Sequence, residues 1–346
     1  MKLNYITTVN IDEESAQAIQ ITSMFKEFEK KLDLDFRSIC MAKDNFSTDN
    51  RVRIRTRENK KLNTILLYFL CLKMKVFASN VFTRDILIAA FCLLLGNQVI
   101  WECHQKTRRI NNLLLKVLNL SKRFSVLAIS EAIKEDVFLP VDKEKIFVYH
   151  DCIDAELLND AYVDKLDDKV ALYTGALHKG KDFDSLICLF NAYPSWRFYI
   201  VGGKHCEIEK YKDILSELDI KNVKFFGRLP HSDVLKMQRE ASVLLYPLTE
   251  SNPLWKYTSP LKLFEYMASY RPIVASRIGS VNEIVSEELA YTYTDNICNA
   301  FSKFLGDEKS QHTLKSKKCI ELLENKFTWG RRVDFICNQI FKLNKL

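Results

Sequence analysis

The sequence predicts an α/β protein with two doubly wound, Rossmann-like domains, and its length and pattern are the reasons. At 346 residues the chain is longer than one hydrophobic core usually fills. Short β-branched segments alternate with amphipathic ones along it, which is typical of parallel sheets with helices on both faces. We therefore expect residues 1–160 to form a first domain, 161–326 a second, and 327–346 a helix that crosses back to the first.

The individual elements follow from β-branched runs, apolar periodicity and turn residues. Strands are predicted over 3–9, 36–41, 76–79, 99–103, 124–130 and 145–154 in the first half, and over 170–174, 196–201, 222–226, 241–246 and 273–276 in the second. Helices are predicted over 15–32, 64–72 and 327–343, from Glu131 and Pro260, and after a capping box at Ser280 and Glu283. The polar stretch 157–169 is interpreted as the linker between the domains.

The charge is concentrated in one part of the chain. The net charge is +7, yet residues 51–123 carry fifteen Lys and Arg against three acids, Glu58, Asp85 and Glu102. A solvated surface, nucleic acid and anionic lipid head groups all suit such a segment. The sequence has no RNA- or DNA-binding motif, and no aromatics interleave with the arginines of 51–57. We therefore expect no nucleic acid partner, and an anionic membrane surface or a lipid-diphosphate acceptor at residues 51–123.

The sequence also bears on where the protein works. No segment resembles a signal peptide or a membrane span, since the longest uncharged apolar run covers only 86–95. The ten cysteines are scattered singly, without the spacing of a zinc site, and free thiols in a reducing compartment explain them best. A cytoplasmic protein, peripheral on the inner face of the cell membrane, is expected.

The most informative stretch covers residues 258–283. Ser259 suits a helix cap and Pro260 the first turn, so a helix is predicted to open there. Because helical side chains lean toward the N-terminus, Lys262 and Glu265 are expected to point back toward the free amides of that first turn. Such amides suit a phosphate group. An ordinary capped helix with a solvated glutamate is the alternative.

The segment SPLKLFEYMASYRPIVAS resembles the donor-site motif of family-four GT-B glycosyltransferases of the bacterial surface-polysaccharide type. Members of this family are retaining enzymes that bind a nucleotide sugar between two Rossmann-like domains facing across a cleft. The resemblance implies that the helix start holds the donor diphosphate and that Glu265 holds the ribose hydroxyls. The helix-start residues are Ser259, Pro260, Leu261 and Lys262.

Other loops match the same family. YTGALHKGKDF resembles its donor-domain loop, in which Gly175 permits close approach of the backbone and Lys181 pairs with the diphosphate. Gly202 and Arg228 follow later strands, where Gly202 would line the nucleotide pocket and Arg228 would reach the base or remain solvated. VIWECHQ resembles the strand that ends near the transferred sugar, which places His104 beyond a strand's carboxyl end, where ligands bind. His104, Lys181 and Glu265 are the expected catalytic residues.

Rival enzyme classes lack their motifs. A dehydrogenase needs a Gly-x-Gly-x-x-Gly turn after the first strand, and only Gly96 precedes Gly175. The Asp-x-Asp letters of a metal-dependent transferase occur at 33–35 and 182–184, and we interpret both as turn or helix-start acids. A glycoside hydrolase would need two carboxylates across a scissile bond, and no convincing pair is found.

The sequence thus leads to a retaining, metal-independent glycosyltransferase that moves a sugar from a nucleotide diphosphate to a polysaccharide or lipid-linked acceptor in cell-surface glycan synthesis. It is expected to need no cofactor beyond the nucleotide sugar, its co-substrate. The open alternative is a catalytically impaired GT-B-shaped subunit acting as a binding partner. Two departures favour that alternative, because Ala176 stands where the family commonly has arginine and Tyr257 where it often has glutamate.

Overall fold

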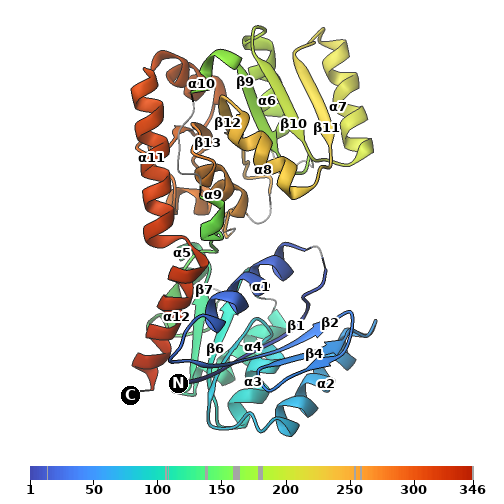
Figure 1. The fold of residues 1–346 in the computed structure, drawn as a ribbon, viewed down its shortest axis with the longest axis vertical. Helices are drawn as coiled ribbons and strands as arrows, with labels where there is room; N and C mark the ends of the chain where they lie inside the picture. Colours follow the sequence, from blue (N-terminus) through green and yellow to red (C-terminus); the bar gives the residue numbers. More distant parts are fainter. Residues whose placement is uncertain are drawn as a thin grey trace. The chain divides into compact units, whose positions relative to one another are not determined.

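The computed structural model describes residues 1–13, 15–105, 107, 109–136, 139–158, 164–177, 182–252, 255–257 and 259–344. The chain divides into two compact units, one of Met1–Cys152 with Trp329–Leu346 and one of Ile153–Thr328. Each unit is built on a parallel sheet with helices packed against it, which confirms the predicted α/β class (Figure 1). Within the described ranges, no helix combines the length and apolar character that crossing a membrane requires.

The first unit is organised around a sheet of order β3-β4-β2-β1-β5-β6-β7-β8. Its strands are β1 (Lys2–Asn10), β2 (Asp35–Ala42), β3 (Phe46–Ser47), β4 (Arg51–Arg55), β5 (Asn80–Thr83), β6 (Gln98–Cys103), β7 (Phe124–Ala128) and β8 (Ile146–Val148). The strands from β4 to β8 pair in parallel, and β3 runs antiparallel to β4. The carboxyl ends of the parallel strands therefore share one edge, where a ligand site is expected.

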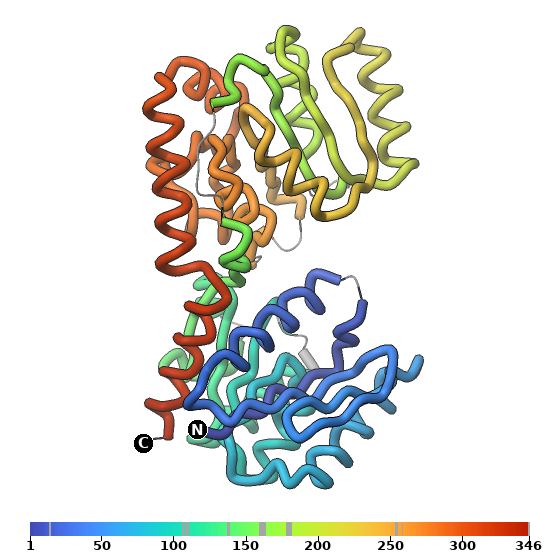
Figure 2. Tube along the Cα trace, in the orientation of Figure 1, coloured from blue at the N-terminus to red at the C-terminus, as the bar shows by residue number. Residues whose placement is uncertain are grey.

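The helices of this unit lie on two faces of the sheet. They are α1 (Ala16–Glu29), α2 (Lys60–Lys73), α3 (Ile86–Leu94), α4 (Arg109–Asn119), α5 (Glu131–Lys134) and α12 (Trp329–Leu343). The crossover α1 steps from β1 to β2, whereas α2, α3 and α4 lead in the other direction, so right-handed connections put them on the opposite face. There α2 contacts α3, and α3 contacts α4. The helix α12 packs beside α1 (Figure 2).

The second unit has a sheet of order β11-β10-β9-β12-β13-β14. Its strands are β9 (Val170–Thr174), β10 (Arg197–Val201), β11 (Val223–Gly227), β12 (Val243–Tyr246), β13 (Ile273–Ser276) and β14 (Tyr291–Tyr293), and all of these pair in parallel. Its helices are α6 (Phe183–Ala192), α7 (His205–Glu217), α8 (His231–Glu240), α9 (Leu261–Ala268), α10 (Ile297–Gly306) and α11 (Lys309–Lys326). An aromatic core that includes Phe183, Phe198 and Phe301 fills the space between sheet and helices.

The structure differs from the local expectations in several places. The strand predicted over 76–79 lies at Asn80–Thr83, because Lys75 and Ala78 adopt positive φ angles and turn the chain first. The arginine run at 51–55 forms the strand β4, whose alternating pattern the charge had obscured. The predicted capping box leads only into a 3₁₀ turn at Gly279–Glu283, which no side chain caps.

Candidate donor and acceptor sites

Glycine turns at the carboxyl ends of β9, β10 and β11 form the base of a site in the second unit. The Gly175 amide donates to the Val201 carbonyl at 2.8 Å, and the Gly202 amide donates to the Gly227 carbonyl at 2.6 Å. Gly202 has φ +107, and a Cβ added there would lie 2.3 Å from the Gly175 carbonyl oxygen. Only glycine fits this position, so the structure brings Gly175 and Gly202 together. Arg228 follows directly after β11 and is exposed.

Lys262 lies beside the Gly175 turn within a group of tyrosines that we name the tyrosine cage, Tyr173, Tyr246 and Tyr266. Its Nζ lies 4.3, 5.0 and 5.8 Å from the three ring centroids, in that order. The same atom is 3.1 Å from the position that a Cβ of Gly175 would take. Cation–π attraction therefore holds the ammonium group at the backbone turn.

The tyrosine cage is itself fixed and uncharged. The Tyr266 hydroxyl accepts from the Thr174 amide at 2.8 Å, and the Tyr173 hydroxyl donates to the Ala176 carbonyl at 2.6 Å. Burial raises the pKa of all three tyrosines, which keeps the hydroxyls protonated. The rings thus surround the lysine without neutralising its charge.

The start of α9 differs from the predicted geometry. The N-cap position belongs to Pro260 rather than Ser259, and no side chain caps the helix. The Leu261 amide donates to the Ser259 carbonyl at 3.1 Å, so this expected phosphate donor has a backbone partner. Lys262 is then the second residue of α9, and its side chain carries the positive charge of this helix start.

Glu265 faces a histidine that the sequence did not single out. His231 Nε2 lies 2.9 Å from Glu265 Oε1, and that hydrogen bond raises the pKa of His231. His231 opens α8, shortly after β11 ends at Gly227. The signal was therefore present, since this histidine follows the carboxyl end of a predicted strand, as His104 does.

Lys181 cannot be placed in this site. It lies with His178, Lys179 and Gly180 outside the described residues. Its expected role toward a diphosphate stays a prediction from the sequence.

The first unit has its own cavity, of about 910 Å³. It lies at the carboxyl ends of β1, β5 and β6, and His104 and Trp101 belong to its wall. Arg57, which precedes α2, and Lys60, the first residue of α2, line it as well. The cavity is large enough for a sugar-sized ligand and presents both apolar and charged groups.

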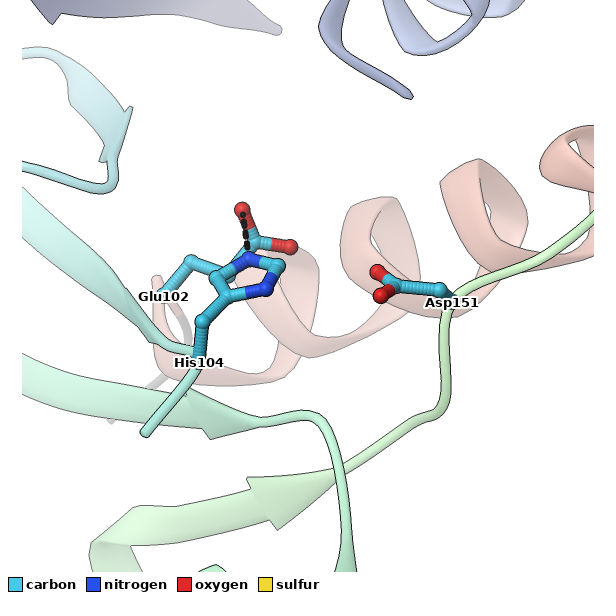
Figure 3. Close-up of side chains that lie close together, drawn as sticks. All are labelled: Glu102, His104 and Asp151. Atoms are coloured by element: carbon cyan, nitrogen blue, oxygen red, sulfur yellow. Dashed lines mark ion pairs between the residues drawn. The ribbon is translucent and has the colours of Figure 1, made fainter. Parts of the chain in front are cut away.

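A buried charge network underlies this cavity. The fully buried Glu102 pairs with Arg84 at 2.5 Å and with Arg332 of α12 at 2.6 Å. Its third partner is His104, whose Nε2 lies 3.1 Å from a carboxylate oxygen of Glu102 (Figure 3). Burial would raise the pKa of Glu102, but the two guanidinium groups hold it well below its usual range. Glu102 is therefore ionised, and it orients the imidazole of His104.

Glu102, His104 and Asp151 also have the atom spacing of a cation site, with ligand atoms within 4.8 Å of one another (Figure 3). Arg332 lies between the carboxylates, 2.6 Å from Glu102 and 3.9 Å from Asp151. With Arg84 it already supplies the counter-charge that a metal ion would bring. We therefore assign this cluster as an ion-pair network.

The sequence signal for that network was weak. Glu102 stood out only as one of three acids in a basic segment, and nothing marked Arg84 or Arg332 as its partners. Arginine and glutamate are seldom fully buried unless they are paired, so a glutamate inside an otherwise apolar strand was the one usable hint.

Comparisons with known proteins agree with this architecture. Residues 168–307 match the family model described as glycosyl transferases group 1. No curated protein matches the chain. Among solved structures, HepE from Anabaena in complex with UDP superposes with a TM-score of 0.75 at 15% identity, covering 99% of this chain and 100% of that one.

Two further structures show the same fold. Sucrose-phosphate synthase from Thermosynechococcus elongatus has a TM-score of 0.74 at 14% identity, covering 99% of this chain and 98% of that one. The lipopolysaccharide outer core galactosyltransferase WaaB has a TM-score of 0.66 at 17% identity and covers 100% of both chains. Residues 168–307, in the second unit, are thus similar to group 1 glycosyl transferases, and the whole chain shares the GT-B fold of these three structures.

Proposed function

We propose that the chain is a retaining glycosyltransferase that takes a sugar from a nucleoside diphosphate. The observation that carries the proposal is Lys262, held by the tyrosine cage against the Gly175 turn. A cation beside a glycine turn and a helix start is the arrangement that a diphosphate requires. Glu265, one turn further along α9, would hold the ribose hydroxyls.

The chemistry follows from charge. The bond between the anomeric carbon and the diphosphate oxygen breaks, and negative charge grows on the departing diphosphate. Lys262, the start of α9 and Lys181 would stabilise that charge without a metal ion. The acceptor hydroxyl oxygen forms the new bond to the same carbon, and its proton passes to the departing phosphate. His104, oriented by Glu102, would contact the transferred sugar.

The similar structures support a proposal for the substrates. HepE was solved with UDP and with UDP-glucose, and WaaB is a lipopolysaccharide galactosyltransferase. We propose a uridine diphosphate sugar as the donor and a polysaccharide or lipid-linked acceptor in cell-surface glycan synthesis. Buried free thiols, such as Cys40 and Cys152, fit work in the reducing cytoplasm.

The impaired-subunit alternative rests on Ala176 and Tyr257. Lys262 weakens that argument, because its ammonium lies at the Gly175 turn, immediately before the position where the family's arginine is replaced by Ala176. The Gly175 turn therefore has a cation beside it, although this cation comes from Lys262 of α9 rather than from the turn itself. We favour the enzyme for this reason.

A nucleotide screen tests the proposal. UDP, GDP, ADP and CDP are compared by thermal shift, and UDP at a hundred times its dissociation constant should add about 2.7 kcal/mol of stability. Release of UDP from UDP-sugars is then followed with and without EDTA, and chelation should leave the rate unchanged.

The outcomes separate the alternatives. If none of the four nucleotides stabilises the protein, the donor site is wrong. If UDP binds but no UDP-sugar is hydrolysed or transferred to an added glycan acceptor, the chain is the impaired subunit. Loss of activity with EDTA, restored by manganese or magnesium, would overturn the metal-independent chemistry.

A further inference from the structure

The helices α2, α3 and α4 of the first unit expose large apolar side chains, and we name their outer surface the α2–α4 face. These exposed residues are Leu62, Ile65, Phe69, Leu72, Leu87, Leu94, Leu113, Val117 and Leu120. The three helices follow one another in contact on one side of the sheet. In α2 and α4 the exposed apolar positions recur at steps of three and four, so each helix presents a stripe rather than isolated side chains.

Packing of the fold does not explain this apolar surface. In α4, Leu115 and Leu118 are buried and already join the helix to the sheet, while Leu113 on its outer side is 71% exposed. Leu120, just beyond α4, is 83% exposed and Leu94 of α3 is 86% exposed. Soluble surfaces seldom gather so many large apolar groups unless they meet a partner.

The charged residues around the α2–α4 face indicate the chemical nature of its partner, because they are positive. The exposed charged residues around the face include Lys61, Lys73, Lys75, Lys116, Lys122 and Arg123. Residues 60–123 contain only two acids. Asp85 is half-buried and accepts from Thr8, and Glu102 is fully buried in its ion-pair network. In the described part of this segment, every fully exposed charge is therefore positive.

Two of the three arginines of β4, which stood out in the charge pattern of the sequence, contribute less. Arg51 pairs with Glu29 and Arg53 with Asp12. Their charge is partly neutralised within the unit. The cationic surface thus belongs to the helices that also carry the apolar stripe.

We propose that the α2–α4 face docks on the surface of an anionic lipid bilayer. Its leucines and phenylalanine insert below the head groups, and the lysines that flank them contact the lipid phosphates. A second copy of the chain fits less well, because two cationic faces would repel each other, whereas a bilayer satisfies both the apolar and the cationic groups. The proposal concerns binding alone and does not depend on the sugar transfer proposed above.

Co-sedimentation with vesicles tests this. Phosphatidylglycerol mixed with phosphatidylcholine should bind the intact chain, and phosphatidylcholine alone should bind it weakly. The triple variant Phe69→Ser, Leu113→Ser, Leu120→Ser should bind anionic vesicles about a hundredfold less, because three apolar insertions are lost. The matched control replaces Ile19, Leu218 and Leu314 with serine, since these exposed apolar residues lie outside the face, and it should bind like the unaltered protein.

A charge variant separates the two contributions. Lys73→Gln, Lys116→Gln, Lys122→Gln should reduce binding mainly at low ionic strength, whereas the apolar variant loses binding at any salt concentration. Its control carries the same changes at Lys224, Lys236 and Lys303, which are exposed in the second unit.

Three results would overturn the proposal. One is equal binding to neutral and anionic vesicles, and another is anionic binding that the apolar triple variant leaves intact. The third is self-association in sedimentation velocity that the same variant abolishes, since a second copy would then cover the face.

Discussion

The two units surround a charged side chain at their sites in different ways. In the first, the carboxylate of Glu102 is enclosed by the guanidinium groups of Arg84 and Arg332, so its negative charge is neutralised by positive charges. In the second, the ammonium group of Lys262 is surrounded by the neutral rings of the tyrosine cage. Both arrangements lie near the carboxyl ends of parallel strands, yet their consequences differ.

This difference implies different roles for the two sites, one in stability and one in ligand binding. A closed ion-pair network holds its members in place and has little charge left to offer a ligand, so its main effects are on folding and on the orientation of His104. Aromatic rings stabilise a cation while leaving its charge intact, so the tyrosine cage can present Lys262 to a phosphate. Changes in the first site should therefore alter stability, and changes in the second should alter nucleotide binding.

The largest expected effect comes from Arg332→Met. It leaves Glu102 buried with one guanidinium partner fewer, and we expect the free energy of unfolding to fall by about 3 to 5 kcal/mol in urea titrations. The neighbouring Arg331→Met, at an exposed position, is the control and should change stability by less than about 0.5 kcal/mol. In the double variant with Glu102→Gln, part of the loss should return. A loss that the double variant only deepens would mean that Arg332 acts through packing.

Gly202→Ala should have the next largest effect. A Cβ at this position collides with the Gly175 carbonyl and demands an unfavourable φ, so roughly 2 to 3 kcal/mol of stability should be lost. UDP binding should fall as well, because the Gly175 turn must shift. Gly306→Ala is the matched control, since nothing lies within 4 Å of its added methyl group. Unchanged UDP affinity in a folded Gly202→Ala protein would remove the glycine turns from the site.

The smallest expected effect concerns the pair of His231 and Glu265. The pKa of His231 is raised in the folded state, so the pair's stabilisation is fully present below the unfolded pKa of about 6.5 and is lost as pH rises through the folded pKa. His231→Gln should therefore destabilise the protein at pH 5.5 but not at pH 9, by less than about 1 kcal/mol because the pair is half-exposed. A loss that is equal at both pH values would exclude the ion pair as its cause.

The sequence predicted the second unit better than the first, for a physical reason. The residues of its site lie in short sequence patterns, such as the glycine turn at Gly175 and the helix that carries Lys262 and Glu265. The strand β13 was predicted with its exact bounds. The cage tyrosines come from three separate elements, so no local pattern could group them around the lysine. In the first unit, Arg84 and Arg332 meet Glu102 only after the chain has folded. The strand at Asn80–Thr83 was predicted four residues too early. Besides the turn before it, the strand begins with a polar residue, Asn80, which is buried and donates a hydrogen bond to the Lys2 carbonyl.

The role of Lys262 as the diphosphate contact is the central claim, and calorimetric titration of UDP tests it most directly. Loss of a charged hydrogen bond to phosphate is worth about 1.5 to 3 kcal/mol, so Lys262→Met should weaken UDP binding about ten- to a hundredfold. The control Lys236→Met changes an exposed lysine on α8 and should bind UDP normally, and melting temperatures verify that both variants are folded. A folded Lys262→Met protein that binds UDP within about twofold of the unaltered protein would contradict the account.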